Sequence, residues 1–141
     1  MTETPTSETR SVVIERDMPY PPDKVWRALT DRPLIEDWLM SNDFEPIVGH
    51  RFTLRTQAVG GWNGIIDCEV LAVEPPARLS YTWASMGLES VVTFTLVPTA
   101  AGARLRMEQS GFPAGAEQNL RGAEYGWNNF LGRLEQVLAR A

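Results

Sequence analysis

The stretch AEQNLRGAEYGWNNFLGRLEQVL, residues 116–138, decides the fold, because its apolar residues recur at steps of three and four. These residues are Leu120, Ala123, Trp127, Phe130, Leu131, Leu134 and Leu138. At about 100° per residue they form one stripe along a helix, and Arg121, Tyr125 and Gln136 lie off it. The spacing predicts an amphipathic helix of about six turns that needs an apolar surface to pack against.

The region from residue 44 to residue 110 predicts that surface, because apolar and polar side chains alternate there between turn signals. Strands are expected at residues 51–58, 64–74, 78–83, 92–96 and 104–109. The connections between them are short, and short connections favour antiparallel neighbours. The chain therefore predicts an α+β fold, in which the long helix covers the apolar face of an antiparallel sheet.

Two short helices are expected after a first strand over residues 11–18, where β-branched residues cluster. Pro22 suits the first turn of a helix, where no amide donor is needed, and that helix is expected to continue to Thr30. Asp31 is a suitable N-cap for a second helix that runs through Leu39.

Length and composition predict one soluble, cytoplasmic domain. The chain has 141 residues, of which 43% are apolar and 22% charged, and this excludes a disordered chain or a fibre. No stretch approaches the roughly 18 apolar residues of a membrane span, and residues 1–10 predict a disordered tail before a domain at 11–141. A net charge of −5 argues against nucleic-acid or membrane binding. Cys68 is the single cysteine and fits a reducing compartment.

Few groups are available for chemistry. One histidine and one cysteine cannot build a zinc site, so neither a metal nor a cofactor is expected. Cys68 lies within an apolar alternation, where cysteine behaves as a small hydrophobic residue. His50 follows Gly49 at the start of a strand and is expected in solvent, with a general-base role at a cavity mouth as the alternative.

Several segments resemble one known superfamily. They are PDKVWRALT at 22–30, Trp38, Gly49 with Phe52, residues 64–76 followed by RLSYTW at 78–83, and Gly126-Trp127 with the leucine-rich end of the last helix. Together they resemble the START-like, or SRPBCC, superfamily, in the branch named after the activator of the heat-shock-protein ATPase (AHSA-like). The resemblance implies a helix-grip fold, in which a curved sheet wraps the C-terminal helix around a cavity of a few hundred Å³.

By this resemblance, the inward sheet face and the helix stripe would line the cavity. The expected lining residues are Trp38, Phe52, Leu54, Trp62, Ile66, Cys68, Tyr81, Trp83, Phe94, Met107, Gln109, Glu124, Trp127, Phe130 and Leu131, with Trp38, Leu39 and Trp62 at the mouth. The alternative is that these side chains fill the interior completely. Gln109, Glu124 and Tyr81 are the polar members, and they either orient a ligand or form a satisfied structural network.

Three functions are compatible with this pattern. The first is the binding of a hydrophobic or amphipathic small molecule in the cavity. The second is a protein-interaction module that resembles the co-chaperones of the branch, with a chaperone as partner. The third is an enzyme of the cyclase or hydrolase kind, for which His50, Glu124 and Tyr81 are the available acid–base groups.

Overall fold

This computed structural model describes residues 9–58, 60–85 and 87–140. Within them the chain forms seven strands and three helices. In order they are β1 (Thr9–Met18), α1 (Pro22–Thr30), α2 (Arg32–Trp38), β2 (Ser41–Asn42), β3 (Arg51–Arg55), β4 (Ile65–Glu74), β5 (Arg78–Ser85), β6 (Leu88–Thr99), β7 (Gly102–Pro113) and α3 (Glu117–Arg140). The predicted α+β helix-grip class is confirmed.

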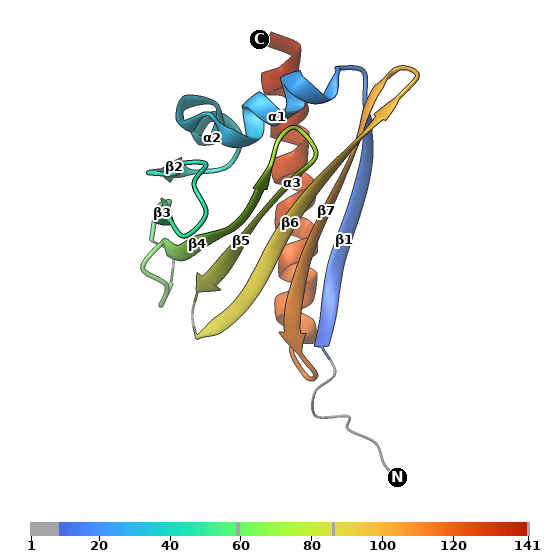
Figure 1. Cartoon of the computed structure of the whole chain (residues 1–141). Helices are drawn as coiled ribbons and strands as arrows, with labels where there is room; N and C mark the ends of the chain where they lie inside the picture. The colour runs from blue at the N-terminus through green and yellow to red at the C-terminus, as the bar shows by residue number, and fades with distance from the viewer. Residues whose placement is uncertain (1–8, 59, 86, 141) are drawn as a thin grey trace.

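The strands form one antiparallel sheet in the order β1-β7-β6-β5-β4-β3-β2. From β2 to β7 each strand pairs with the next in sequence, which confirms the predicted meander. β1 pairs with β7 at the other edge, with Val12 opposite Gln109 and Ile14 opposite Met107. The sheet curves around α3, so the first strand and the last helix of the chain lie in contact (Figure 1).

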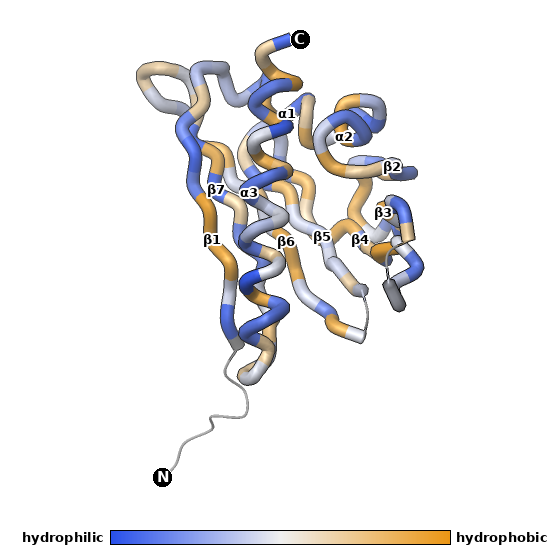
Figure 2. Tube along the Cα trace, turned by 180° about the vertical axis from the view of Figure 1, so that it is seen from behind, coloured by the Kyte–Doolittle hydropathy of each residue, from blue (hydrophilic) through white to orange (hydrophobic). Residues whose placement is uncertain are grey.

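The predicted apolar stripe of α3 packs against the inner face of the sheet. Glu117 in the first turn and Arg140 in the last turn suit the positive and negative ends of the helix dipole. Trp127, Leu131 and Leu134 are at most 2% exposed, which confirms that the stripe faces the core. Figure 2 shows α3 in front of the sheet, with hydrophilic and hydrophobic residues interspersed along it.

α1 and α2 lie at one end of the sheet, and Trp38 ties them together (Figure 1). Pro22 occupies the first turn of α1, as predicted. The buried Trp38 Nε1–H donates a hydrogen bond to the Ala28 carbonyl, at 2.8 Å. Asp31 holds the N-cap position of α2, yet in the described part of the chain its carboxylate faces Arg27, 4.0 Å away, and caps no amide.

Several boundaries differ from the predicted ones, because pairing between strands decides where a strand ends. β1 starts at Thr9, opposite Pro113, so pairing extends into the segment predicted to be a tail. Residues 1–8 of that segment lie outside the described residues. β3 ends at Arg55, where its partner Ile65 begins β4, and the sequence did not indicate the two-residue strand β2.

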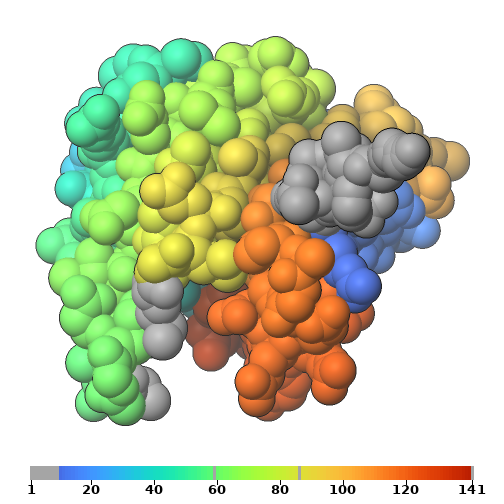
Figure 3. Space-filling model, turned by 90° about the horizontal axis from the view of Figure 1, so that it is seen from below, coloured from blue at the N-terminus to red at the C-terminus, as the bar shows by residue number. Residues whose placement is uncertain are grey.

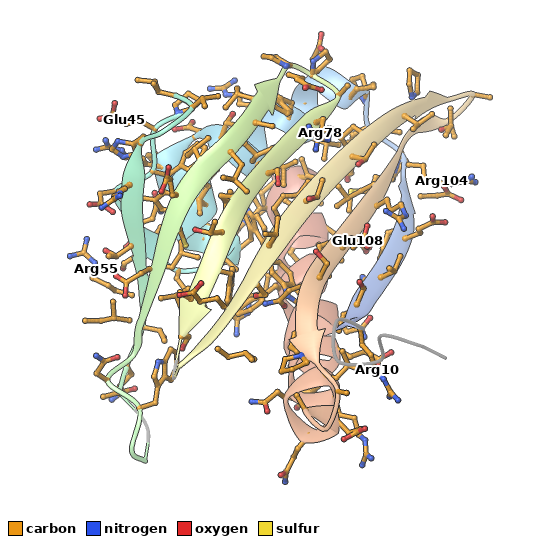
Figure 4. The ribbon with its side chains drawn as sticks, turned by 60° about the horizontal axis from the view of Figure 1, so that its bottom comes forward. Arg10, Glu45, Arg55, Arg78, Arg104 and Glu108 are labelled. Carbon is orange, nitrogen blue, oxygen red and sulfur yellow. The ribbon has the colours of Figure 1, made fainter. Side chains whose placement is uncertain are left out.

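Charged side chains occupy the outer face and the edges of the sheet. Arg104 of β7 donates to Asp17 of β1 at 2.8 Å, and this hydrogen bond holds the pKa of Asp17 below its usual value. At the sheet–helix edge, Arg16 of β1 donates to Glu135 of α3 at 3.0 Å. Arg104 and Glu108 lie on the side of the sheet away from α3 (Figure 4). The inner face is thereby left to apolar contacts.

Replacing Trp127 with alanine should lower the free energy of unfolding by about 3–5 kcal/mol, because a large buried aromatic side chain is lost. Tyr125→Ala, at a site on the same helix that is 73% exposed, is the matched control and should change stability by about 0.5 kcal/mol or less. Urea denaturation measures both values. A loss under about 1 kcal/mol for Trp127→Ala would show that this residue does not anchor the core.

Candidate functional site

A pocket of about 570 Å³ opens between the sheet and the part of α3 from Asn119 to Arg133. Its walls come from the segment after α2, the β3–β4 connection, the strands β4 to β7, and α3. Seen from below, the molecule is hollowed between the green residues of the β3–β4 region and the orange residues around the start of α3 (Figure 3). The volume lies within the range of small-molecule pockets, roughly 300–1,000 Å³.

Aromatic and aliphatic side chains dominate the pocket wall. The apolar lining residues are Leu39, Met40, Trp62, Ile66, Trp83, Leu88, Phe112, Ala123, Trp127 and Phe130. The Trp127 ring lies 5.2 Å from the Trp83 ring and 5.5 Å from the Phe130 ring, between centroids. Such a wall favours a ligand with an apolar body, because contact with these side chains removes apolar surface from water.

A chain of buried hydrogen bonds fixes the inner wall. Trp127 Nε1–H donates to Gln109 Oε1 at 2.8 Å, and Gln109 Nε2–H donates to Ser90 Oγ at 2.8 Å. Ser90 Oγ–H donates in turn to the Trp83 carbonyl at 3.1 Å. The prediction that Gln109 faces inward is confirmed, and its amide is satisfied by protein partners, as the structural alternative expected.

Small residues on α3 create the space for the pocket. Gly122, Ala123 and Gly126 line it, and Gly122 and Gly126 are one helical turn apart. A Cβ atom added at Gly126 would meet only the Phe130 ring, at an ordinary contact distance of 3.9 Å. Neither glycine was predicted to line the cavity, and Gly126 was noted only as part of the family resemblance. A glycine pair at this spacing within a helix, where glycine is unfavourable, is a usable signal of a gap in the packing.

The structure brings six of the predicted lining residues to this pocket: Trp62, Ile66, Trp83, Gln109, Trp127 and Phe130. Eight others are buried in the core: Trp38, Phe52, Leu54, Cys68, Tyr81, Phe94, Met107 and Leu131. They face inward, as the alternation predicted, but they pack against one another. The placement of Trp38 at the pocket mouth is wrong, because its side chain is buried in the core, whereas Leu39 and Trp62, the other two residues expected there, line the pocket.

Ring-to-ring packing explains why these residues leave no space. The Phe52 and Tyr81 rings lie 5.2 Å apart, and Phe44, which the sequence analysis did not select, lies 5.2 Å from Phe52. The Tyr81 ring continues the cluster to Phe94, at 6.0 Å. Burial raises the pKa of the Tyr81 hydroxyl well above its usual range, so Tyr81 is a poor proton donor at neutral pH.

Glu124 is exposed on α3 and is not part of the pocket wall, so the expectation that it points into the cavity is wrong. It precedes Trp127 by three residues, which places the two side chains about 60° apart around the helix axis. The pocket separates this part of α3 from the sheet, and Ala123 is therefore only half-buried. A side chain displaced by that angle reaches solvent here.

The remaining reactive groups do not meet in the pocket. His50 Nε2 lies 2.9 Å from the Asp43 carbonyl, and its ring stacks on Phe52. Burial raises the pKa of the Cys68 thiol, which disfavours the reactive thiolate. Across residues 9–58, 60–85 and 87–140, no three His, Cys, Asp or Glu side chains gather as metal ligands.

Within the same residues, no helix has the length and apolar character needed to cross a bilayer.

A second depression, of about 640 Å³, lies among the strands alone. Charged side chains line much of it, among them Arg51, Asp67, Glu69 and Glu89. Arg51 and Glu69 form an ion pair across β3 and β4, at 3.7 Å. Because this lining is charged and already paired in part, the pocket beside α3 is the better candidate for an organic ligand.

A curved antiparallel sheet that grips a C-terminal helix, with a pocket between the two, defines the START-like helix-grip class of proteins. The chain belongs to the family described as Activator of Hsp90 ATPase homolog 1-like protein, whose model matches residues 19–139. The resemblance inferred from the sequence is therefore confirmed.

Solved structures agree with this assignment. Protein MLL2253 from Mesorhizobium loti is 53% identical, with 94% of this chain and 98% of that chain covered and a TM-score of 0.86. CalU16 from Micromonospora echinospora is 29% identical, with 96% and 80% covered and a TM-score of 0.77. DynU16, from the dynemicin biosynthetic locus, is 27% identical with a TM-score of 0.80. The match covers 92% of this chain but only 47% of DynU16. No curated protein matches the chain.

Replacing Gln109 with leucine should cost about 1–3 kcal/mol of stability, because the buried Trp127 N–H then loses its acceptor. Gln136→Leu makes the same exchange at an exposed position of α3 and serves as the control. Thermal and urea denaturation compare the two variants. An NMR spectrum in which the Trp127 indole proton keeps its position in Gln109→Leu would contradict the proposed hydrogen bond.

The Cys68 thiol should react slowly in the folded protein, since it is buried and its raised pKa keeps it protonated. Labelling with a disulfide reagent near pH 8 should be about 100-fold slower than for the chain unfolded in guanidinium chloride. Cys68→Ser should keep any ligand binding that the native protein shows. Fast labelling of the native protein would contradict the burial of this residue.

Proposed function

We propose that this protein binds a hydrophobic or amphipathic small molecule in the pocket between the sheet and α3. The observation that carries the proposal is the pocket itself: about 570 Å³, walled by Trp62, Trp83, Trp127 and Phe130. Apolar pockets with a few polar groups are the usual form of a small-molecule site. The inner wall is already held by the Gln109 hydrogen bonds, so binding does not have to order it.

Apolar burial can supply useful affinity in such a pocket. A ligand that loses roughly 200 Å² of apolar surface to the wall gains about 5 kcal/mol at 25 cal/mol per Å². Part of this gain offsets the loss of translational and rotational freedom on binding. We therefore expect an affinity of about 1 mM for simple probes and tighter binding for a ligand that fills the pocket.

One relative supports a role with small molecules. DynU16, which is 27% identical to this chain, is described as a protein in the dynemicin biosynthetic locus. A protein encoded in a biosynthetic locus is placed to meet small organic molecules. By analogy of fold, the pocket beside α3 is where this chain would hold one.

We propose binding without turnover, because the candidate acid–base groups are dispersed. Tyr81 lies in the core, Glu124 is exposed on α3, and His50 contacts the Asp43 carbonyl outside the pocket wall. Proton transfer requires such a group within hydrogen-bond reach of the substrate.

The single buried thiol, Cys68, is compatible with a reducing compartment, so the cytoplasm is the proposed location.

A protein-interaction role with a chaperone partner is the second candidate, and the description of the family favours it. Such a role would use the outer surface. Ile47 and Val48 are adjacent, 57% and 62% exposed, and are the first place to test for it. Their replacement by serine should leave small-molecule binding unchanged and would weaken a protein complex only if this role exists.

Replacing Gly126 with leucine should fill the pocket from the helix side and weaken ligand binding at least about tenfold, or about 1.4 kcal/mol. The substitution does not oppose the helix, because leucine has the higher helix propensity. Binding is measured by NMR titration with fatty acids, sterols and aromatic metabolites. Native mass spectrometry of protein purified from its own host would identify a retained ligand.

Gly132→Leu is the matched control, because Gly132 lies on the same helix outside the pocket lining and an added Cβ meets nothing within 4 Å. It should bind as the native protein does. If no probe shifts the resonances of the pocket residues, or if Gly126→Leu binds unchanged, the pocket is not a ligand site. The interaction role would then take first place.

A further inference from the structure

The pocket has a one-sided charge. Among the described residues that line it, Arg133 is the only ionisable side chain, and none of them carries a carboxylate. Its guanidinium carbon lies 5.6 Å from the centre of the Phe130 ring, so this cation sits beside an aromatic part of the wall. The chain as a whole has a net charge of −5, so the positive charge at this site is local.

Within the part of the chain that the structure describes, Arg133 forms no ion pair. The positions three and four residues away on α3, where an acidic partner would stand, hold Asn129, Phe130, Gln136 and Val137. Glu135 pairs with Arg16 at the β1 edge, at 3.0 Å. The guanidinium is therefore free to bind an external anion.

A second donor in the wall lacks an acceptor. Trp62 Nε1 is the one side-chain nitrogen or oxygen, among the described residues, that is buried without a hydrogen-bond partner. A buried donor left unpaired is uncommon in native proteins and calls for an explanation such as an absent ligand. By contrast, the Gln109 amide and the Ser90 hydroxyl are already engaged: they are hydrogen-bonded to each other, to the Trp127 indole N–H and to the Trp83 carbonyl.

The Arg133 guanidinium and the Trp62 indole N–H favour the same kind of partner. A guanidinium and an indole N–H can only donate hydrogen bonds. An ionised carboxylate can only accept them, and it pairs with arginine in a planar, two-pronged geometry. The apolar wall meanwhile suits an aromatic or aliphatic body.

On the basis of the proposed function, we infer that the ligand is an amphipathic organic anion, a carboxylate on an apolar body. Arg133 pairs with the charge, and the Trp62 indole N–H donates to an acceptor oxygen of the ligand. The tryptophan and phenylalanine rings hold the apolar part. Arg133 and Trp62 thereby select the class of ligand that binds.

A matched pair of probes tests the charge preference: 2-naphthoate and the neutral 2-naphthamide, which have nearly the same shape. By isothermal titration calorimetry the carboxylate should bind at least about tenfold more tightly at low salt. Raising the ionic strength should reduce this ratio, since the arginine is exposed and salt screens its charge. Decanoate and decanamide repeat the comparison with an aliphatic body.

Variants then assign the preference to residues. Arg133→Gln should lower the affinity for 2-naphthoate about tenfold and leave 2-naphthamide within about twofold. Arg121→Gln removes the same charge from the same helix outside the pocket lining, and should leave the ratio of the two affinities unchanged. The Trp62 indole N–H resonance, identified by its loss in Trp62→Phe, should move on addition of 2-naphthoate. The resonance of Trp26, outside the pocket lining, should stay in place.

The outcomes separate this inference from the proposed function. Equal affinity for the charged and neutral probes, or an unchanged ratio in Arg133→Gln, overturns the inference and leaves small-molecule binding in place. An unmoved Trp62 resonance overturns the role of that donor. If neither probe of either pair binds the native protein, this inference falls together with the proposed function.

Discussion

The Trp127 side chain is the contact on which the interior arrangement depends. It is 2% exposed, and its ring contacts Trp83 and Phe94 of the sheet at 5.2 and 5.8 Å between centroids. Its N–H is bound to Gln109 of β7. Aromatic contacts and a buried hydrogen bond together fix the distance and the rotation of α3 relative to the sheet.

This fixed distance divides the space beneath the sheet into two parts. Beyond Trp127, the side chains of Leu131, Leu134 and Leu138 are buried and fill the interior, and only Phe130 and Arg133 among the described residues of this half still line the pocket. Before Trp127 it presents Gly122 and Gly126, which are too small to span the same gap. Trp127 fixes the position of α3, and the two glycines have no side chain to fill the space between this part of α3 and the sheet. This unfilled space is part of the pocket.

The fold was largely predictable because it follows from periodicity. The spacing of Leu131, Leu134 and Leu138 places them on one side of a helix whatever their partners are, and alternation likewise places Gln109 on the inner face. Periodicity gives the direction of a side chain but not the depth of what lies opposite it. The sequence therefore treated Tyr81 and Trp83 alike, although one packs into the core and the other lines the pocket.

The same limit explains the two kinds of error at the site. Glu124 was expected inside because its angle on the helix was considered without the curvature of the sheet, and curvature depends on contacts between distant strands. Arg133 and Gly126 were not predicted to line the cavity, because neither residue stands out from the pattern of α3. They become significant only when the β3–β4 connection brings Trp62 to the other side of the gap.

The pocket thus combines a constant part with a variable part. Its inner wall is built from Trp127, Gln109 and Ser90, whose hydrogen bonds join β6, β7 and α3, so a change there disturbs the packing of the whole domain. Its outer wall uses Trp62 and Leu88, which adjoin connections between strands, where substitution costs less packing. A fold built in this way can keep its core while exchanging the ligand that it accepts, and the preference for one ligand class then rests on the residues at the outer wall.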